Sequence, residues 1–268
     1  MRFFILLLIS LAPFSSEAQS NFPGGYIDLQ IEKLNDQLPE VKFGLREPVI
    51  IDLDDHWRIL IGLDLSLLPG QYVMYYKHTN DDTSGKHKTL EVIQKVYPFN
   101  DLKESAPDEM VDYYPQIALS SIDFANTQQP TLPLSKPLTG DWQQQFGFQW
   151  FVEGGDEVIT NNAISIKARQ FSPVLAPQNA IVSNIIMDQR ELATLVLDHG
   201  RGLYSVLHGL TDLTVDIGNG VVAGAVLGRL PALTNIDHSR LVWQTLLNGV
   251  FVDPNLLSKR DLASEHAK

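Results

Sequence analysis

The chain is built of short segments in which apolar and polar residues alternate, separated by turns rich in glycine, proline and aspartate. Alternation with period two is the signature of strands that bury one face. The clearest such segments are 26–31, 49–53, 90–93, 180–182, 193–197, 204–207 and 221–222. Glycines at 218, 220, 224 and 228 space the turns near the C-terminus. The pattern predicts an all-β fold of closely spaced antiparallel strands.

The segments fall into two groups. Residues 19–97 predict a small β-sandwich, in which the dense apolar run from Trp57 to Leu65 is typical of a strand buried on both faces. Residues 98–140 hold several prolines and no strong periodicity, which indicates a connector against the surface with one short helix at 108–114. Residues 141–257 predict a second antiparallel β domain. The charged tail, 258–268, is expected to fray.

The first residues indicate export. Arg2 precedes an apolar run, and the small-residue site Ser16-Glu17-Ala18 follows it, as in a secretory signal peptide covering residues 1–18. The run is shorter than the roughly 20 apolar residues of a membrane span. The chain has no cysteine, which excludes disulfides and a lipidated thiol. These features predict a periplasmic protein without a membrane span.

The acidic balance narrows the range of partners. The formal net charge is −12 and the pI is about 4.9, which argues against nucleic acid or an anionic membrane as the main partner. The sequence contains no Gly-x-Ser-x-Gly elbow, no phosphate loop and no cysteine nucleophile.

Five ordered fragments of the second domain carry a family resemblance. They are Pro173-Val174-Leu175-Ala176-Pro177, Asp198-His199-Gly200-Arg201-Gly202-Leu203, Val215-Asp216-Ile217-Gly218 with Gly224-Ala225-Val226-Leu227-Gly228, Leu241-Val242-Trp243, and Asn248-Gly249 with Val252-Asp253-Pro254. Together they resemble the lysostaphin/LytM-type zinc metalloendopeptidases of the bacterial cell wall. Pro23-Gly24-Gly25, Trp57 and Gly62-Leu63-Asp64-Leu65 resemble the β-domain found in some Gram-negative members. The resemblance implies a duplicated hybrid motif fold and a link to peptidoglycan.

The resemblance also assigns metal positions, and this sequence departs from the pattern at each of them. Asn161 and Ser165 stand where the family has its first His and Asp ligands, and Val242 stands where it has the third ligand. Asn, Ser and Val are poor zinc ligands or none. We therefore expect no metal and no other cofactor.

The two catalytic histidine positions of the family are occupied by Gly209 and Arg240. His208 lies one residue before Gly209, and neighbouring side chains on a strand point to opposite faces. This one-residue offset predicts that His208 points away from the active-site groove of the family, unless a bulge intervenes. His199, in the Asp-His-Gly hairpin, is expected to be a packed structural residue.

Asn161, Ser165, His208, Arg240 and Trp243 are the candidate groove and ligand-binding residues. Arg240 has two interpretations. It is either a surface cation whose stem packs on Trp243 or a neighbour, or it binds a carboxylate from this chain or from a peptide stem.

Three functions follow from these expectations. The first is a non-catalytic periplasmic LytM-like pseudoenzyme that binds peptidoglycan or regulates a cell-wall hydrolase. The second is an active peptidoglycan metalloendopeptidase with an altered metal site, which added metal would reveal. The third is a structural or assembly subunit of an envelope complex, which would form a stable complex without affinity for the wall.

Overall fold

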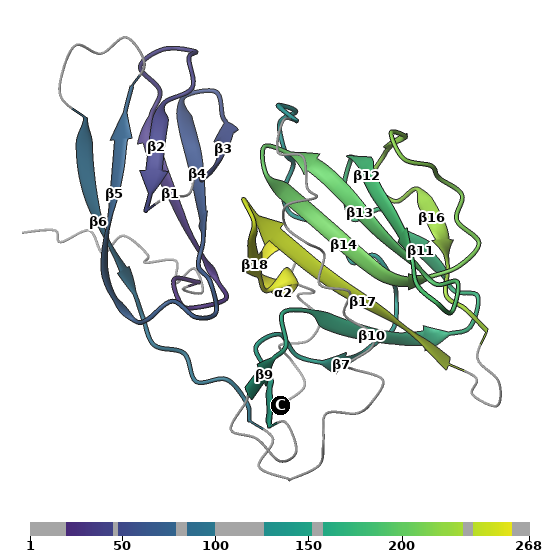
Figure 1. The fold of residues 1–268 in the computed structure, drawn as a ribbon. Helices are drawn as coiled ribbons and strands as arrows, with labels where there is room; N and C mark the ends of the chain where they lie inside the picture. Colours follow the sequence, from purple (N-terminus) through teal and green to yellow (C-terminus); the bar gives the residue numbers. More distant parts are fainter. Residues whose placement is uncertain are drawn as a thin grey trace, which may run out of the picture.

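The computed structural model describes residues 20–44, 48–78, 85–99, 126–151, 158–232 and 238–258. The predicted signal peptide, the helix predicted at 108–114 and all but the first residue of the tail lie outside these ranges. Within them, every element is a strand except the single helical turn α2 (Pro254–Leu257). The all-β prediction is confirmed, and the strands form two domains that lie side by side (Figure 1).

The N-terminal domain is a sandwich of two three-stranded antiparallel sheets, in the orders β1-β4-β3 and β2-β5-β6. Its strands are β1 (Tyr26–Glu32), β2 (Glu40–Phe43), β3 (Val49–Asp52), β4 (His56–Gly62), β5 (Gly70–Lys77) and β6 (Lys86–Val92). Strand β1 alternates buried and exposed residues, as its period-two sequence predicts. Its buried residues pack with Trp57, Met74 and Val92 in the core between the sheets.

Strand β4 is buried on both faces, as predicted from its dense apolar run. Ile59 and Ile61 belong to the sandwich core, whereas Leu60 belongs to the core of the second domain, with Leu247 and Val250. Gly62 lies at this junction, where a Cβ would come within 3.0 Å of Val250 Cβ. The two domains therefore share apolar surface.

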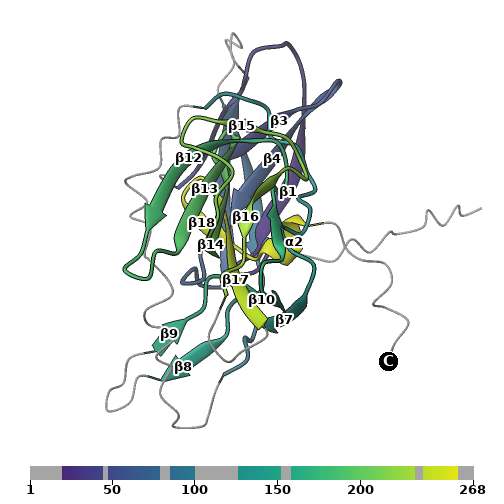
Figure 2. The same cartoon turned by 90° about the vertical axis from the view of Figure 1, so that its right-hand side faces the viewer.

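The C-terminal domain is organised around one large antiparallel sheet in the order β15-β12-β13-β14-β17-β10-β7, with β18 pairing β17. Its strands are β7 (Asp141–Gln144), β10 (Ile164–Arg169), β12 (Ala180–Met187), β13 (Ala193–Gly200), β14 (Leu203–Leu210), β15 (Gly220–Val221), β17 (His238–Leu247) and β18 (Val250–Val252). A small sheet of β11 (Pro173–Leu175) and β16 (Val226–Arg229) adds Val174 and Leu227 to the core of this domain. The hairpin of β8 (Gln149–Phe151) and β9 (Val158–Thr160) lies next to β7 and β10 (Figure 2).

Residues 126–140 of the predicted connector are mostly exposed or partly exposed, but two of their leucines are buried. Leu134 and Leu138 are buried in the core of the C-terminal domain. The backbone of Leu134 donates a hydrogen bond to Leu257, at 2.8 Å. The burial of these leucines could not be predicted from the sequence, because the few apolar residues of this proline-rich segment follow no strand or helix period.

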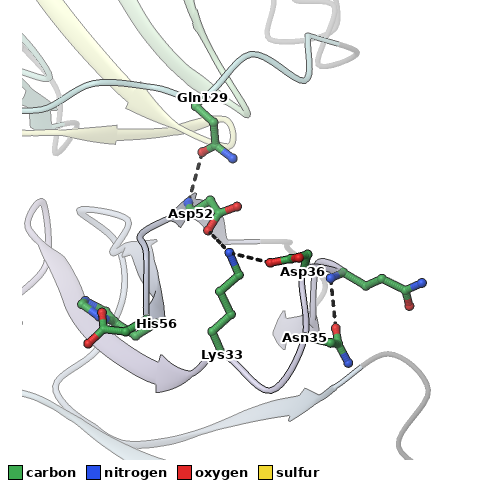
Figure 3. A network of polar contacts seen from close by, with 8 residues as sticks. Lys33, Asn35, Asp36, Asp52, His56 and Gln129 are labelled. Atoms are coloured by element: carbon green, nitrogen blue, oxygen red, sulfur yellow. Dashed lines mark hydrogen bonds and ion pairs between the residues drawn. The ribbon is translucent and has the colours of Figure 1, made fainter.

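The same segment also reaches the N-terminal domain. The amide of Asp52, at the end of β3, donates a hydrogen bond to Gln129 Oε1 at 3.1 Å (Figure 3). Lys33 Nζ in turn lies 2.7 Å from Asp52 Oδ1 and 3.1 Å from Asp36 Oδ1. At the other end of the segment, Asn126 accepts a hydrogen bond from the amide of Arg201 in the β13–β14 turn. The segment thus joins both domains by polar contacts as well as by its buried leucines.

Candidate functional site

Two of the three predicted metal positions, Ser165 and Val242, lie in one row across the large sheet, whereas Asn161 precedes β10. Ser165 on β10 pairs directly with Val242 on β17, and Val242 pairs with His208 on β14. His208 pairs in turn with Thr194 on β13. Directly paired residues of an antiparallel sheet point to the same face. We refer to this side of the sheet, which carries Ser165, Val242, His208 and Thr194, as the site face.

The next row points to the opposite face and forms the core. It consists of Ile164, Trp243, Leu207 and Leu195, all fully buried. Trp243 therefore packs in the core of the domain, and the prediction that it lines the groove is wrong. The physical reason is the period of two, because Val242 and Trp243 are adjacent and must point to opposite faces.

The sequence predicted that His208 points away from the groove unless a bulge intervenes, and β14 contains such a bulge. The register passes from the pair Thr194–His208 to the pair Ala193–Leu210, so Gly209 is the extra residue. Gly209 has φ of +88°, the left-handed conformation that glycine adopts in bulges of this type. His208 consequently shares the site face with Val242.

His208 is the centre of a buried chain of hydrogen bonds. Its Nδ1 lies 2.9 Å from Thr194 Oγ1, and its Nε2 lies 2.9 Å from Gln244 Oε1. The Gln244 amide nitrogen donates to Asn162 Oδ1 at 2.6 Å. Because Gln244 Oε1 can only accept, Nε2 of His208 carries the proton and Nδ1 accepts from Thr194.

This network keeps the imidazole neutral. His208 is 2% exposed, and burial lowers its pKa to about 4, a shift that the hydrogen bond to Gln244 opposes. Both ring nitrogens are engaged, so neither has a free lone pair for a ligand. Sequence reasoning missed Thr194, Gln244 and Asn162. Gln244 had one available signal, since it lies two residues beyond Val242 and must share its face.

Asn161 supports the local backbone. Its side-chain nitrogen donates to the carbonyls of Gln145 and Ala163, each at 2.9 Å, and its Oδ1 accepts from the amide of Ala163 at 3.2 Å. These bonds form a turn that leads into β10, so the amide is already occupied. Ser165 is fully buried, and its Oγ has no hydrogen-bond partner among the described residues.

These residues do not fit the zinc ion that the resemblance implies. Zinc in proteins takes Cys, His, Asp or Glu ligands with unengaged donor atoms. Val242 offers no donor, Asn161 and His208 have theirs engaged, and Ser165 alone presents a free oxygen. Across the part of the chain that the structure describes, no group of three or more His, Cys, Asp or Glu residues could hold a metal ion.

Basic residues follow on the same face, toward the start of β17. Lys167 pairs with Arg240, and Arg169 pairs with His238. Because these positions lie two and four residues from Ser165 and Val242, they also belong to the site face. Lys167 and Arg240 are partly exposed, and Arg169 and His238 are exposed. We refer to these four residues as the basic row. Sequence reasoning identified Arg240 and missed Lys167, since a cross-strand partner depends on register.

The structure does not reproduce packing of Arg240 on Trp243, because the two side chains belong to rows on opposite faces. Arg240 forms no ion pair or side-chain hydrogen bond with any described residue. The same holds for Lys167, Arg169 and His238.

A surface pocket of about 440 Å³ lies at the same end of the sheet. Its lining comes from the turns that follow β10, β12 and β14 and from the segment after β16, and consists of Phe171, Arg190, Glu191, Leu192, Thr211, Asp212, Pro231 and Ala232. Phe171 comes two residues after Arg169. No residue of the basic row lines this pocket. The basic row is nevertheless the accessible part of the site face, whereas the predicted metal positions are buried.

His199 has the structural role predicted for it. Its Nδ1 lies 2.9 Å from the Asn179 carbonyl and its Nε2 lies 2.9 Å from Ser205 Oγ. Burial lowers the pKa of His199 to about 4, and the hydrogen bond to the Asn179 carbonyl opposes this shift. It is 1% exposed and faces no solvent or groove.

The chain is similar to known proteins both in sequence and in structure. Residues 160–254 match the model of peptidase family M23. A putative peptidase M23 from Pseudomonas aeruginosa has a similar structure, with 20% identity, a TM-score of 0.65, and coverage of 89% of this chain and 95% of that one. Since that match spans both domains, the two-domain arrangement is common to the two structures. No curated protein matches the sequence.

Two further solved structures match part of the chain. A zinc containing peptidase from Vibrio cholerae matches at 16% identity and a TM-score of 0.41, over 50% of this chain and 41% of that chain. The catalytic domain of lysostaphin from Staphylococcus simulans matches at 15% identity and a TM-score of 0.35, over 43% of this chain and 89% of that chain.

Residues 160–254 are therefore similar to peptidase family M23, and the fold of the whole chain is similar to that of the putative peptidase M23 structure. The described residues include no helix long and apolar enough to cross a membrane.

Proposed function

We propose that this protein is a non-catalytic, periplasmic member of the M23 group that acts by binding peptidoglycan. The observation that carries the proposal is the row Ser165, Val242 and His208. It includes two positions, Ser165 and Val242, where the family resemblance places metal ligands, and its histidine has both ring nitrogens engaged. A hydrolytic zinc site needs three ligands and an open position for water.

The fold tolerates this loss because the domain is stabilised by burial. The core row on the opposite face, Ile164, Trp243, Leu207 and Leu195, is fully buried and belongs to the hydrophobic core of the domain. A structural zinc domain of small size would unfold without its ion. In this proposal the domain keeps the fold of the family and lacks the residues that would bind zinc. Binding at the accessible end of the site face is the activity that remains compatible with this arrangement.

The test is co-sedimentation of the mature protein, residues 19–268, with purified peptidoglycan sacculi, while the supernatant is assayed for released muropeptides. We expect pelleting without release, with and without added zinc. A quadruple variant that restores the family residues at the four positions (Asn161→His, Ser165→Asp, Arg240→His, Val242→His) serves as a comparison for metal uptake. Release of muropeptides by the unmodified protein would refute the proposal and support an active enzyme with an altered metal site.

A protein that neither pellets nor cleaves would also refute binding to the wall. That result would favour a protein partner, either a cell-wall hydrolase that it regulates or an envelope complex in which it is a subunit. A pull-down of the tagged full chain from a periplasmic extract, followed by identification of any stoichiometric partner, separates these two outcomes.

A further inference from the structure

A further junction between the two domains lies at the start of helix α2. The amide of Asp253 donates a hydrogen bond to the carbonyl of Gly24 at 2.8 Å. The hydroxyl of Tyr26 donates to the carbonyl of Leu256 at 3.2 Å. The side chain of Asp253 also caps α2, since it accepts from the amide of Asn255 at 3.0 Å. These bonds join the first residues of the N-terminal domain to the last turn of the C-terminal domain.

The half-buried Lys95 lies beside this junction, between two aromatic rings. Its Nζ is 3.9 Å from the centroid of the Phe22 ring and 4.6 Å from that of the Tyr97 ring. The hydroxyl of Tyr97 donates a hydrogen bond to the carbonyl of Pro23 at 2.5 Å. An ammonium over an aromatic face is attracted by the ring, and more strongly when it is partly removed from water. Lys95 therefore holds together the segments where the chain enters and leaves the N-terminal domain.

The charge of Lys95 also acts on Asp253 of the C-terminal domain. Burial lowers the pKa of Lys95, and the negative charge of Asp253 opposes this shift. Burial raises the pKa of Asp253, whereas hydrogen bonds from Asn255 and the charge of Lys95 lower it. One cation is thus placed between two rings of the N-terminal domain and attracts a carboxylate of the C-terminal domain.

Tyr97 connects this junction to the turn that precedes β10. Its ring lies against Gly147, where a Cβ would come within 2.0 Å of Tyr97 Cδ1. The amide of Gly147 donates to the carbonyl of Asn161 at 2.7 Å, and the amide of Asn161 donates to the carbonyl of Phe148 at 2.8 Å. Asn161 is the first predicted metal position. A continuous series of contacts therefore runs from Lys95 to the edge of the site face.

We propose that Lys95 is a conformational lock, whose cation between Phe22 and Tyr97 keeps the domain junction closed and thereby fixes the turn at Asn161. Loss of the cation would loosen the junction and this turn together, because Tyr97 contacts both. Close packing transmits the change, since the ring fills the space beside Gly147 and leaves no room for independent movement. The lock concerns the coupling of the two domains and does not depend on the proposed function.

The experiment measures hydrogen exchange of single backbone amides by NMR at pH 7, in the mature protein and in Lys95→Met. The amide of Asp253 reports on the junction, and the amides of Gly147 and Asn161 report on the turn. Methionine keeps the length and apolar contacts of the lysine stem and removes the charge. We expect exchange about 10-fold faster at Asp253 and at least about 3-fold faster at Gly147 and Asn161, the size of effect that a partly buried cation–π contact produces.

Two control variants separate charge from packing and from net charge. Lys95→Arg keeps a cation that can lie over a ring, so its exchange rates should stay within about twofold of the unmodified protein. Lys88→Met removes the same charge from an exposed position on β6 and should leave all three amides unchanged. Amides of β13 and β14, in the centre of the large sheet, should be unchanged in every variant. If they also exchange faster in Lys95→Met, the milder Phe22→Leu, which removes one ring, replaces it as the test.

Three results would overturn the proposal. The first is an unchanged rate at Asp253 when the cation or a ring is removed. The second is equal acceleration in Lys95→Met and Lys95→Arg, which would assign the effect to packing. The third is acceleration at Asp253 without acceleration at Gly147 and Asn161, which would show that the junction and the turn move independently. Co-sedimentation with sacculi tests the proposed function separately, so the two can fail independently.

Discussion

Acidification should destabilise this protein through two buried histidines, and the effect can be calculated. Burial lowers the pKa of His208 and of His199 from 6.5 to about 4. Above pH 6.5 both rings are neutral in the folded and unfolded states, so neither affects stability. Below pH 6.5 the unfolded chain takes up protons that the folded chain cannot bind. Stability therefore falls as the pH falls from 6.5 to about 4.

The magnitude follows from linkage. For one histidine whose pKa shifts from 6.5 to about 4, the free energy of unfolding decreases by about 2 kcal/mol at pH 5 and by about 3 kcal/mol at pH 4. Two histidines that titrate independently therefore lower the free energy of unfolding by about 4 kcal/mol at pH 5. This is a large fraction of the 5–15 kcal/mol typical of domains, about half of a mid-range value.

Urea denaturation at pH 7 and pH 5, followed by tryptophan fluorescence, measures this loss. His208→Gln keeps a polar side chain between Thr194 and Gln244 but cannot titrate, so it should reduce the pH-dependent loss from about 4 to about 2 kcal/mol. His87→Gln, at an exposed position on β6, is the control and should leave the loss unchanged. If His208→Gln loses as much stability between pH 7 and pH 5 as the unmodified protein, the neutral buried network is refuted.

Three further predictions concern stability, measured as the free energy of unfolding in urea at pH 7. Ser165→Ala removes a buried hydroxyl that has no described partner, and should be neutral or stabilising by about 1 kcal/mol; a loss above that value would reveal a hidden hydrogen bond. Trp243→Ala empties a core position and should cost about 3–5 kcal/mol, whereas a cost below about 1 kcal/mol would contradict its placement in the core. Gly62→Val places branched carbons against Val250 and should cost about 1–3 kcal/mol and reduce the cooperativity of unfolding between the domains; an unchanged transition would argue against their shared core.

Much of the fold could be predicted from the sequence because strands are local patterns. The alternation of Tyr26 to Ile31 appears directly in the burial of β1, and the dense run after Trp57 appears in β4, which is buried on both faces. The packed role of His199 was also predictable, since the residue lies within a recognisable hairpin. Leu134 and Leu138 were missed because they reach the core from a segment with no period.

The candidate site was only partly predictable. The positions predicted to correspond to metal ligands came from motif spacing, but the faces to which they point depend on register, and register depends on contacts between distant strands. The one-residue offset from the family's histidine position suggested that His208 points away from the site face. Its pairing with Thr194, next to the extra residue Gly209, places it on the site face instead. The partnership of Lys167 with Arg240 joins positions 73 residues apart and leaves no local signal.

The sequence by itself determined the class of fold, because alternation is a property of each residue and its immediate neighbours; it also predicted that the metal positions hold no zinc ligands. The tertiary structure alone decided which of these residues meet: that His208 is held between Thr194 and Gln244, that Trp243 belongs to the core, and that Lys167 and Arg240 stand side by side at the accessible end of the sheet. The physical reason is that strand pairing and bulges set the direction of every side chain, and both arise from the packing of the whole sheet.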